Sequence, residues 1–177
     1  MDSINKNQPE DNFENLAGSK AIEKLKDLSK DQTCFFVTNE TNSQTGGVRP
    51  MGVLDVDDSG NIWFMSASDS HKNAAIAQDP SVKLFFKGSD HAEFLSLEGR
   101  ATISTSKDDI KRLWSFMLKT WFTEGEDDPR ITVIKVTPTD GYYWDNKHGS
   151  AVAGIKMFTG AVIGKTLDDS IEGRIAP

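Results

Sequence analysis

The sequence predicts a mainly β fold, an antiparallel sheet or closed barrel with flanking helices. Seven short runs rich in β-branched and aromatic residues follow one another, each bounded by Gly, Asp, Asn, Ser or Pro. Most of these runs are not separated by a long helix, whereas a doubly wound α/β sheet needs one between successive strands. The 177 residues suffice for one domain with its own hydrophobic core.

The strands are predicted where the apolar runs occur. They are Thr33–Asn39, Val48–Val56, Asn61–Ser66, Ser81–Lys87, Ala92–Ser104, Ile131–Thr137 and Gly141–Asp145. The segment "DVDDSGNIWFM" predicts a hairpin whose turn is Asp58-Ser59-Gly60. This hairpin would place the strand that carries Arg49 beside the strand that follows the turn.

Two amphipathic helices are predicted. From Leu16 to Leu28, apolar residues recur at helical spacing with Lys and Glu between them. In "SKDDIKRLWSFMLKTWF" the same spacing extends over the whole segment and predicts one long helix, capped by Ser106 with Asp109 as its reciprocal acid. Its apolar stripe is interpreted as core or dimer packing in preference to a ligand site, and the acidic "EGEDDP" after it as a solvated loop.

The chain divides into three parts. Residues 1–13 are polar and unpatterned, which is typical of a flexible tail. Residues 14–147 hold the predicted strands and helices and form one domain. Residues 148–177 are a C-terminal extension, interpreted as a short helix or strand followed by a polar end.

Composition disfavours several classes of protein. The formal net charge is -7, and no block of Lys or Arg forms the basic patch that nucleic acids or anionic lipids require. The N-terminus lacks the pattern of a signal peptide, and no run reaches the ~18 apolar residues of a membrane span. We therefore expect a cytoplasmic protein with no nucleic-acid or membrane partner. The single cysteine, Cys34, is expected to be a buried structural thiol.

Several catalytic motifs are absent or incomplete. "GAVIGKT" from Gly160 resembles a P-loop, but Thr159 stands where the motif needs its first glycine. The G-x-G-x-x-G and G-x-S-x-G motifs do not occur. His71, His91 and His148 are far apart in the sequence, so no metal site is predicted.

One polar segment suggests an anion site. In "WFMSASDSHKNAAIAQDPSVKLFF", Ser70 is placed to cap a short helix that begins at His71, and the N-terminus of a helix attracts anions. His71 and Lys72 would add side-chain donors, and Arg49 could add a guanidinium fork. The alternative, an ordinary capped helix with a solvated Lys and a surface Arg, remains open at this point.

The order of these segments is more specific than any one of them. "RPMGVLDVDDSGNIWFMSASDSHKNAAIAQDPSVKLFF", then "LSLEGRATI", then "GYYWD" resembles the pyridoxamine 5′-phosphate oxidase-like, FMN-binding split-barrel superfamily, in particular its bacterial general stress protein branch. The resemblance covers about Leu16 to Asp145. It implies a six- to seven-stranded antiparallel split β-barrel that is homodimeric, with residues 14–147 as the FMN-binding domain.

The resemblance also implies a cofactor site. Arg49 and Lys72 would contact the FMN phosphate, with Ser70 and His71 assisting through a hydroxyl, a backbone N–H or the imidazole.

The other implied positions flank the flavin ring. Pro50, Met51 and Gly52 would run along the flavin. Met65 and Ser66 would flank it from the end of the aromatic strand. Trp144 would approach it from the partner subunit.

The sequence departs from the true oxidases at several positions. His71 stands where they have an Arg beside the Lys, and Phe94 where they have a Gln ahead of the Glu-Gly pair. Their C-terminal Arg/His signature for the substrate has no match after "YYWDNKHG". Pyridoxamine 5′-phosphate oxidase activity is therefore not expected.

Two functional hypotheses remain. The first is a general stress protein that holds FMN, with FAD as the alternative, at a homodimer interface without a dedicated fast reaction. The second is a flavin oxidoreductase that takes hydride from NAD(P)H and reduces a small acceptor, with the flavin supplying the chemistry. Heme chemistry, known in related split barrels, has no suitably placed histidine to support it.

Overall fold

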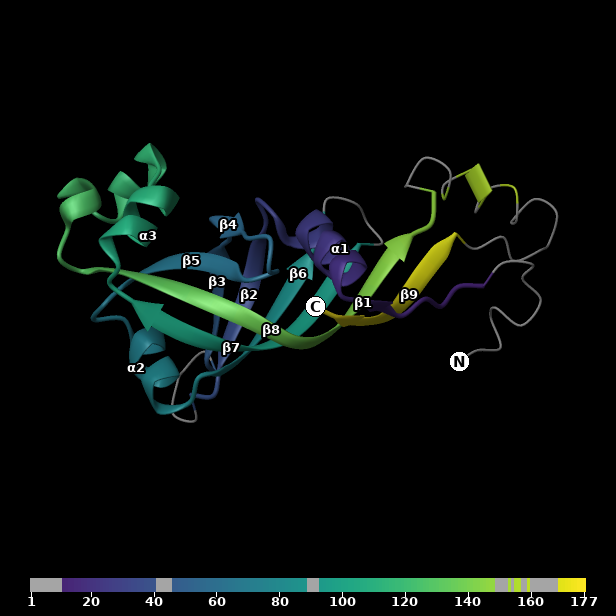
Figure 1. The fold of residues 1–177 in the computed structure, drawn as a ribbon, viewed down its shortest axis with the longest axis horizontal. Coiled ribbons are helices and arrows are strands. Elements are labelled where there is room, and N and C mark those ends of the chain that lie inside the picture. The colour runs from purple at the N-terminus through teal and green to yellow at the C-terminus, as the bar shows by residue number, and fades with distance from the viewer. Residues whose placement is uncertain are drawn as a thin grey trace.

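The protein is mainly β sheet with a few helices, consistent with a split barrel of this superfamily (Figure 1). The computed structural model describes residues 11–40, 46–88, 93–148 and 169–177, together with residues 153, 155, 156 and 159. Its strands are β1 (Leu16–Ala17), β2 (Thr33–Thr38), β3 (Val48–Gly52), β4 (Asp55–Val56), β5 (Ile62–Ala67), β6 (Ser81–Lys87), β7 (Phe94–Ser104), β8 (Ile131–Asn146) and β9 (Ser170–Ala176). Its helices are α1 (Ser19–Ser29), α2 (His71–Gln78), α3 (Lys107–Leu113) and the 3₁₀ turns η1 (Phe116–Thr120) and η2 (Gly125–Asp127).

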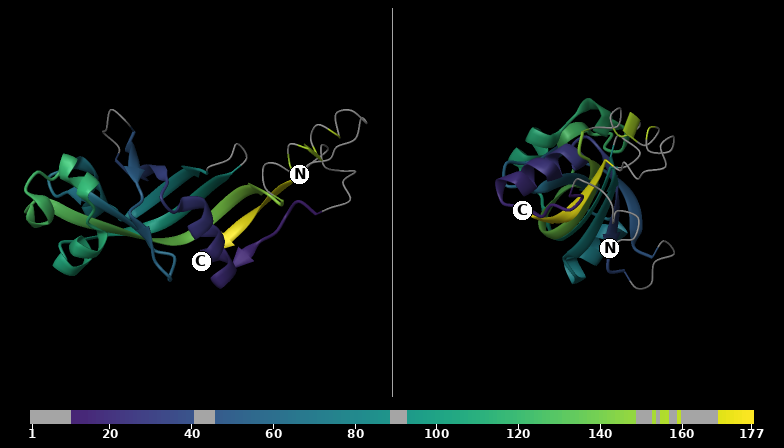
Figure 2. Two further views of the ribbon diagram at one scale, coloured as in Figure 1. Left: turned by 90° about the horizontal axis from the view of Figure 1, so that it is seen from above. Right: turned by 90° about the vertical axis from the view of Figure 1, so that its right-hand side faces the viewer.

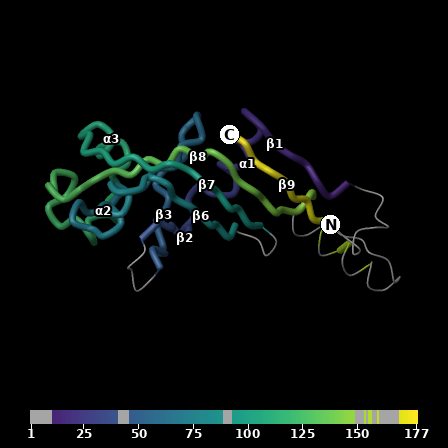
Figure 3. The backbone as a smooth tube through the Cα atoms, turned by 90° about the horizontal axis from the view of Figure 1, so that it is seen from below, coloured from purple at the N-terminus to yellow at the C-terminus, as the bar shows by residue number. Residues whose placement is uncertain are grey.

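The strands form one sheet in the order β1-β9-β8-β7-β6-β2-β3, with β5 joined to β8 and β4 joined to β5. Its longest strand, β8, pairs with β7 on one side; on the other, its first half pairs with β5 and its second half with β9. The first half of β8 therefore lies beside β5, and its second half lies beside β9. Figure 3 shows α2 and α3 near one end of the molecule and β1 and β9 near the other.

The described sheet has nine strands where the resemblance implied six or seven. One addition is β9, which comes from the C-terminal extension and pairs antiparallel with β8. Another is β1, at the start of the predicted first helix, which pairs in parallel with β9. Because Leu16 and Ala17 are used in the sheet, α1 begins only at Ser19.

Three strand predictions need correction. The predicted strand Val48–Val56 is divided into β3 and β4, and it is β4 that forms the hairpin with β5. The strand of Arg49, β3, pairs with β2 instead, so the predicted pairing with Asn61–Ser66 is wrong. The predicted strands Ile131–Thr137 and Gly141–Asp145 are one continuous strand with a register shift opposite Glu98 and Gly99. A bulge there absorbs the extra residue without ending the strand.

The predicted long helix after Ser106 is also wrong. Ser106 does cap α3 by accepting a hydrogen bond from the Asp109 N–H, at 3.3 Å. The reciprocal bond is absent, because the Ser106 N–H donates to the hydroxyl of Ser104 instead. The helix then ends at Leu113, Trp114 takes an extended conformation, and the chain continues as η1.

The main hydrophobic core lies between the sheet and α1, and Figure 2 shows this helix lying against the sheet. Leu25 and Leu28 of α1 are buried against it, and Phe36 meets Phe64 edge to face with ring centroids 5.3 Å apart. The Cys34 thiol is buried as predicted, and burial raises its pKa to about 12, so it is not available as a nucleophile at neutral pH.

Two features of the sequence lie outside the described residues, namely His91 and the P-loop-like segment 160–166. No helix in the described part of the chain is both long enough and apolar enough to span a membrane.

Candidate functional site

A pocket of about 580 Å³ opens at the end of the sheet where β3, β5 and α2 converge. The segment around η1 forms its other side. The pocket is lined by Pro50, Met51, Gly52, Leu54, Met65, Ser66, Ala67, Lys72, Ser115, Met117, Leu118, Trp121 and Phe122. Six of the ten residues that the sequence assigned to a cofactor are among them: Pro50, Met51, Gly52, Met65, Ser66 and Lys72.

The start of α2 is fixed by hydrogen bonds beside this pocket. Ser70 caps the helix as predicted, accepting from the Asn73 N–H at 3.4 Å. The Ser70 hydroxyl is also 3.0 Å from that of Ser66 on β5. Asn73 donates from its amide to the Thr132 hydroxyl, which in turn donates to the Ser66 carbonyl, both at 2.8 Å. The first turn of α2 is thereby fastened to β5 and β8.

Two cations lie near each other at this end of the pocket. Burial, followed by the positive charge of Arg49, lowers the pKa of Lys72 below the ordinary lysine value. No ion pair is recorded for Lys72 within the described part of the chain. An anion bound beside this partly buried ammonium would stabilise its charged form. The N–H groups of Asn73 and Ala74 bond to Ser70, and those of His71 and Lys72 at the helix start could donate to the same anion.

Arg49 already has partners in the protein. One of its terminal nitrogens donates to the Glu40 carboxylate at 2.8 Å and lies 3.5 Å from the Thr38 hydroxyl. Glu40, which the sequence did not indicate, is nine residues before Arg49 and lies two residues beyond the end of β2. A bound anion would have to share Arg49 with this carboxylate.

Four predicted residues are not among those that line the pocket: Arg49 and Ser70, which are described above, and His71 and Trp144. His71 is exposed and does not line it. Trp144 lies near the far end of β8, whereas the pocket residues Met65 and Ser66 pair with Val133 and Thr132 near its beginning. Eleven residues of strand separate Val133 from Trp144, or roughly 35 Å at the usual rise per residue. Within one chain, Trp144 therefore does not reach this pocket.

The η1 side of the pocket was missed by the sequence analysis. Ser115, Met117, Leu118, Trp121 and Phe122 line it. All of them belong to, or adjoin, the apolar stripe that the sequence predicted to be one face of a long helix. The available signal was the density of large apolar residues in "WSFMLKTWF", which exceeds what a single buried helical face needs.

The pocket has one charged end and one apolar end. Among the described residues that line it, Lys72 alone is titratable, and the other side chains are apolar or small hydroxyls. Among the described residues, no cluster of His, Cys, Asp or Glu could hold a metal ion. The lining therefore suits a ligand that carries an anionic group at one end and a large apolar or aromatic group at the other.

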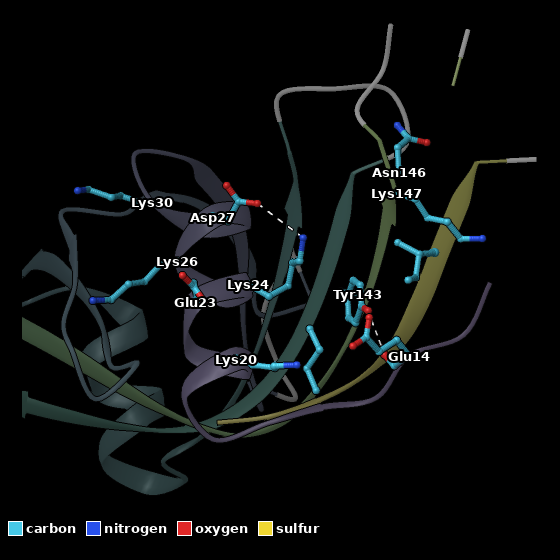
Figure 4. Close-up of a pocket in the computed structure, with 12 residues that line it drawn as sticks. Glu14, Lys20, Glu23, Lys24, Lys26, Asp27, Lys30, Tyr143, Asn146 and Lys147 are labelled. Carbon is cyan, nitrogen blue, oxygen red and sulfur yellow. Dashed lines mark hydrogen bonds and ion pairs between the residues drawn. The ribbon is translucent and has the colours of Figure 1, made fainter. Parts of the chain in front are cut away.

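A larger cleft of about 820 Å³ lies between α1 and the second half of β8 (Figure 4). It contains several lysines, but carboxylates oppose them: Lys24 bonds Asp145 at 2.7 Å and lies 3.7 Å from Asp27. Figure 4 shows Lys26 and Lys30 pointing away from the side where Tyr143 lies. Glu14, Glu23 and Asp27 line this cleft beside its lysines, whereas no carboxylate is among the described residues that line the first pocket.

The sequence was compared with known proteins. The family described as "Pyridoxamine 5'-phosphate oxidase like" matches residues 20–168. Protein bli-3 of Neurospora crassa is 27% identical over 134 residues, which cover 68% of this chain and 64% of that protein. General stress protein 26 of Bacillus subtilis is 29% identical over 83 residues, 45% of this chain and 58% of that protein. The chain thus matches less than two thirds of the length of each of these relatives.

Solved structures give the same fold. A general stress protein 26 candidate from Jannaschia sp. CCS1 superposes with a TM-score of 0.73 at 22% identity, covering 90% of this chain and 100% of that one. The general stress FMN/FAD binding protein of Xanthomonas citri superposes with a TM-score of 0.61 at 26% identity, covering 70% of this chain and 87% of that one. With the family match over most of its length, this chain belongs to the pyridoxamine 5′-phosphate oxidase-like family.

Proposed function

We propose that this protein is a general stress protein that binds FMN, with FAD as the alternative, in the pocket between β3, β5, α2 and η1. One observation carries the proposal. Lys72 is a partly buried ammonium at one end of a pocket lined otherwise by apolar side chains and small hydroxyls, and burial, followed by the charge of Arg49, lowers its pKa. FMN has the matching shape and charge, a phosphate at one end and a fused aromatic ring at the other.

The phosphate would lie at the N-terminus of α2. There the ammonium of Lys72, the guanidinium of Arg49 and the free N–H groups of the first turn would share its negative charge. The Ser70 hydroxyl accepts a hydrogen bond from the Asn73 N–H and is bonded to the Ser66 hydroxyl, so it would hold this turn in place. The exposed position of His71 leaves its backbone N–H as the more direct contribution.

The ring would lie along β3 and the end of β5. Pro50, Met51 and Gly52 line the pocket on one strand, and Met65 and Ser66 line it on the other. When bound, the flavin would supply the redox chemistry, and the protein would bind and orient it. Among the described lining residues Lys72 alone is titratable, so we propose flavin binding as the function and keep NAD(P)H oxidation through the flavin as the alternative.

A second copy of the chain would complete the site. Four exposed aromatic side chains lie on one face of the sheet: Phe35, Phe85, Phe94 and Trp144. Phe35 is paired with Phe85, and Phe94 with Trp144. Phe35 is also paired with Pro50, a pocket residue, so this strip begins at the pocket and ends at Trp144. In a dimer through this face, the partner's Trp144 could reach a flavin that one protomer alone leaves open.

Flavin titration tests the proposal. The protein should quench or shift the fluorescence of added FMN, and riboflavin, which lacks the phosphate, should bind more weakly. Lys72→Ala should remove most of this preference for FMN over riboflavin. Lys30→Ala, which removes an exposed lysine from the other cleft, is the matched control and should leave it unchanged. Absence of FMN binding to the unmodified protein would refute the proposal.

A further inference from the structure

The segment η1 leaves two large apolar side chains exposed at the rim of the pocket. Trp121 is 65% exposed and Met117 is 75% exposed, yet both line the pocket. Exposed apolar side chains that adjoin one another are characteristic of binding surfaces, whereas single scattered ones are not. These two residues are therefore placed to contact whatever occupies the apolar end.

The positions of Met117 and Trp121 are fixed by buried neighbours in the same segment. Phe122 is buried with Ile131 and Val133 of β8, and Leu118 packs against the same cluster. Leu118 and Phe122 follow Met117 and Trp121 directly in the sequence. Each exposed side chain is therefore next in sequence to a buried one. These contacts hold the η1 side of the pocket, which we call the η1 wall, at a defined distance from β8.

The opposite wall of the pocket is made by β3 and the end of β5. Pro50, Met51 and Met65 line that side, and Lys72 stands at the cationic end. A planar ring that extends from an anion at Lys72 along β3 has the η1 wall as its other neighbour. Aromatic side chains gain binding energy by stacking on such rings, and Met adapts its shape to them.

We propose that Trp121, supported by Met117, contacts the ring of the bound flavin and forms the outer wall of the ring site. This inference rests on the proposed function, and it assigns to the pocket a ring-contacting residue that the sequence analysis did not identify. Trp121 acts on the ring end of the ligand, whereas Lys72 acts on its phosphate.

The two ends can be separated with two ligands. Trp121→Ala should weaken the binding of FMN and of riboflavin by the same factor, about 3- to 10-fold for a lost aromatic contact. It should also raise the fluorescence of the bound flavin, because an indole in contact with the ring quenches it. Trp121→Phe should retain most of the affinity. Lys72→Ala should weaken FMN binding alone.

Phe116→Ala is the matched control. Phe116 belongs to the same turn and is 83% exposed, but it does not line the pocket. Its removal should change neither ligand's affinity nor the flavin fluorescence. Thermal unfolding of each variant checks that the fold is intact.

The outcomes distinguish the inference from the proposed function. If the unmodified protein binds neither ligand, the proposed function fails and the inference with it. If FMN binds through Lys72 but Trp121→Ala matches the unmodified protein, or Phe116→Ala loses as much, the inference alone fails. It also fails if Trp121→Ala changes the mass of the protein in solution, because Trp121 would then belong to a subunit interface.

Discussion

At the scale of single residues, Lys72 decides what the pocket can bind. Burial and the charge of Arg49 both lower the pKa of Lys72 below the ordinary value of 10.5. The free protein therefore loses the Lys72 proton at a lower pH than an ordinary lysine would. A bound phosphate stabilises the ammonium, so the pKa of Lys72 is higher in the complex than in the free protein.

The affinity for FMN should consequently fall as the pH rises. Below the lowered pKa of Lys72 the ammonium is present and binding is strong; above it, binding requires uptake of a proton and weakens by up to tenfold per pH unit. The measurement is the dissociation constant of FMN from pH 7 upward, where the phosphate is already a dianion. Lys72→Arg, which stays charged, should give a flat profile. An equally steep decline in that variant would contradict the role of Lys72.

At the scale of secondary-structure elements, the cap of α2 links the fold to the site. Ser70 and Ser106 cap α2 and α3 in the same way, each accepting one N–H bond, at 3.4 and 3.3 Å. Replacing either by Ala should lower the free energy of unfolding by about 1 kcal/mol. Only Ser70→Ala should also weaken FMN binding, because α2 carries Lys72 and α3 does not contribute to the phosphate site.

Paired measurements of denaturant unfolding and FMN titration check this prediction. Ser106→Ala serves as the control for a general loss of stability. If both variants lose affinity equally, the effect comes from global destabilisation and the proposed role of the α2 N-terminus is not supported.

Elements that depend on local chemistry could be predicted from the sequence. The helix that begins after Ser70, the turn at Gly60 and the strand from Ser81 to Lys87 are all confirmed. In each of them the residues that determine the structure are close together in the sequence. They are a cap next to its helix, a glycine with φ 77° in its turn, and alternating side chains in a strand.

Features that depend on contacts between residues far apart in the sequence could not be predicted. The apolar spacing in "IKRLWSFMLKTWF" continues past Leu113, but packing of Leu118 and Phe122 against β8 favours η1 over another helical turn. Arg49 was placed beside the wrong strand because a hairpin signal does not show where the first strand divides. Glu40 carries no motif, and its contact with Arg49 follows only from the pairing of β2 with β3.

At the scale of the whole molecule, the exposed aromatic strip predicts association. Phe35 is 60% exposed and lies in the middle of a β sheet, paired with Phe85 on one side and Pro50 on the other. Phe94 pairs with Lys87, two residues beyond Phe85 on the same face, so the strip continues to Trp144 without changing sides. Burial of this strip against a second copy would remove a large apolar area from water, which favours a dimer.

Light scattering coupled to gel filtration should therefore give a mass of about 39 kDa, twice the 19.5 kDa of the chain. Phe35→Glu should give a monomer, because two copies of the new carboxylate would be buried at the interface without a partner. Phe116→Glu, an equally drastic change at an exposed residue off the strip, should remain dimeric. The monomeric variant should also bind FMN more weakly, since it lacks the partner's Trp144, while its preference for FMN over riboflavin, which depends on Lys72, should persist. A monomeric unmodified protein, or a Phe35→Glu variant that stays dimeric, would show that this face is not the interface and that Trp144 takes no part in the site.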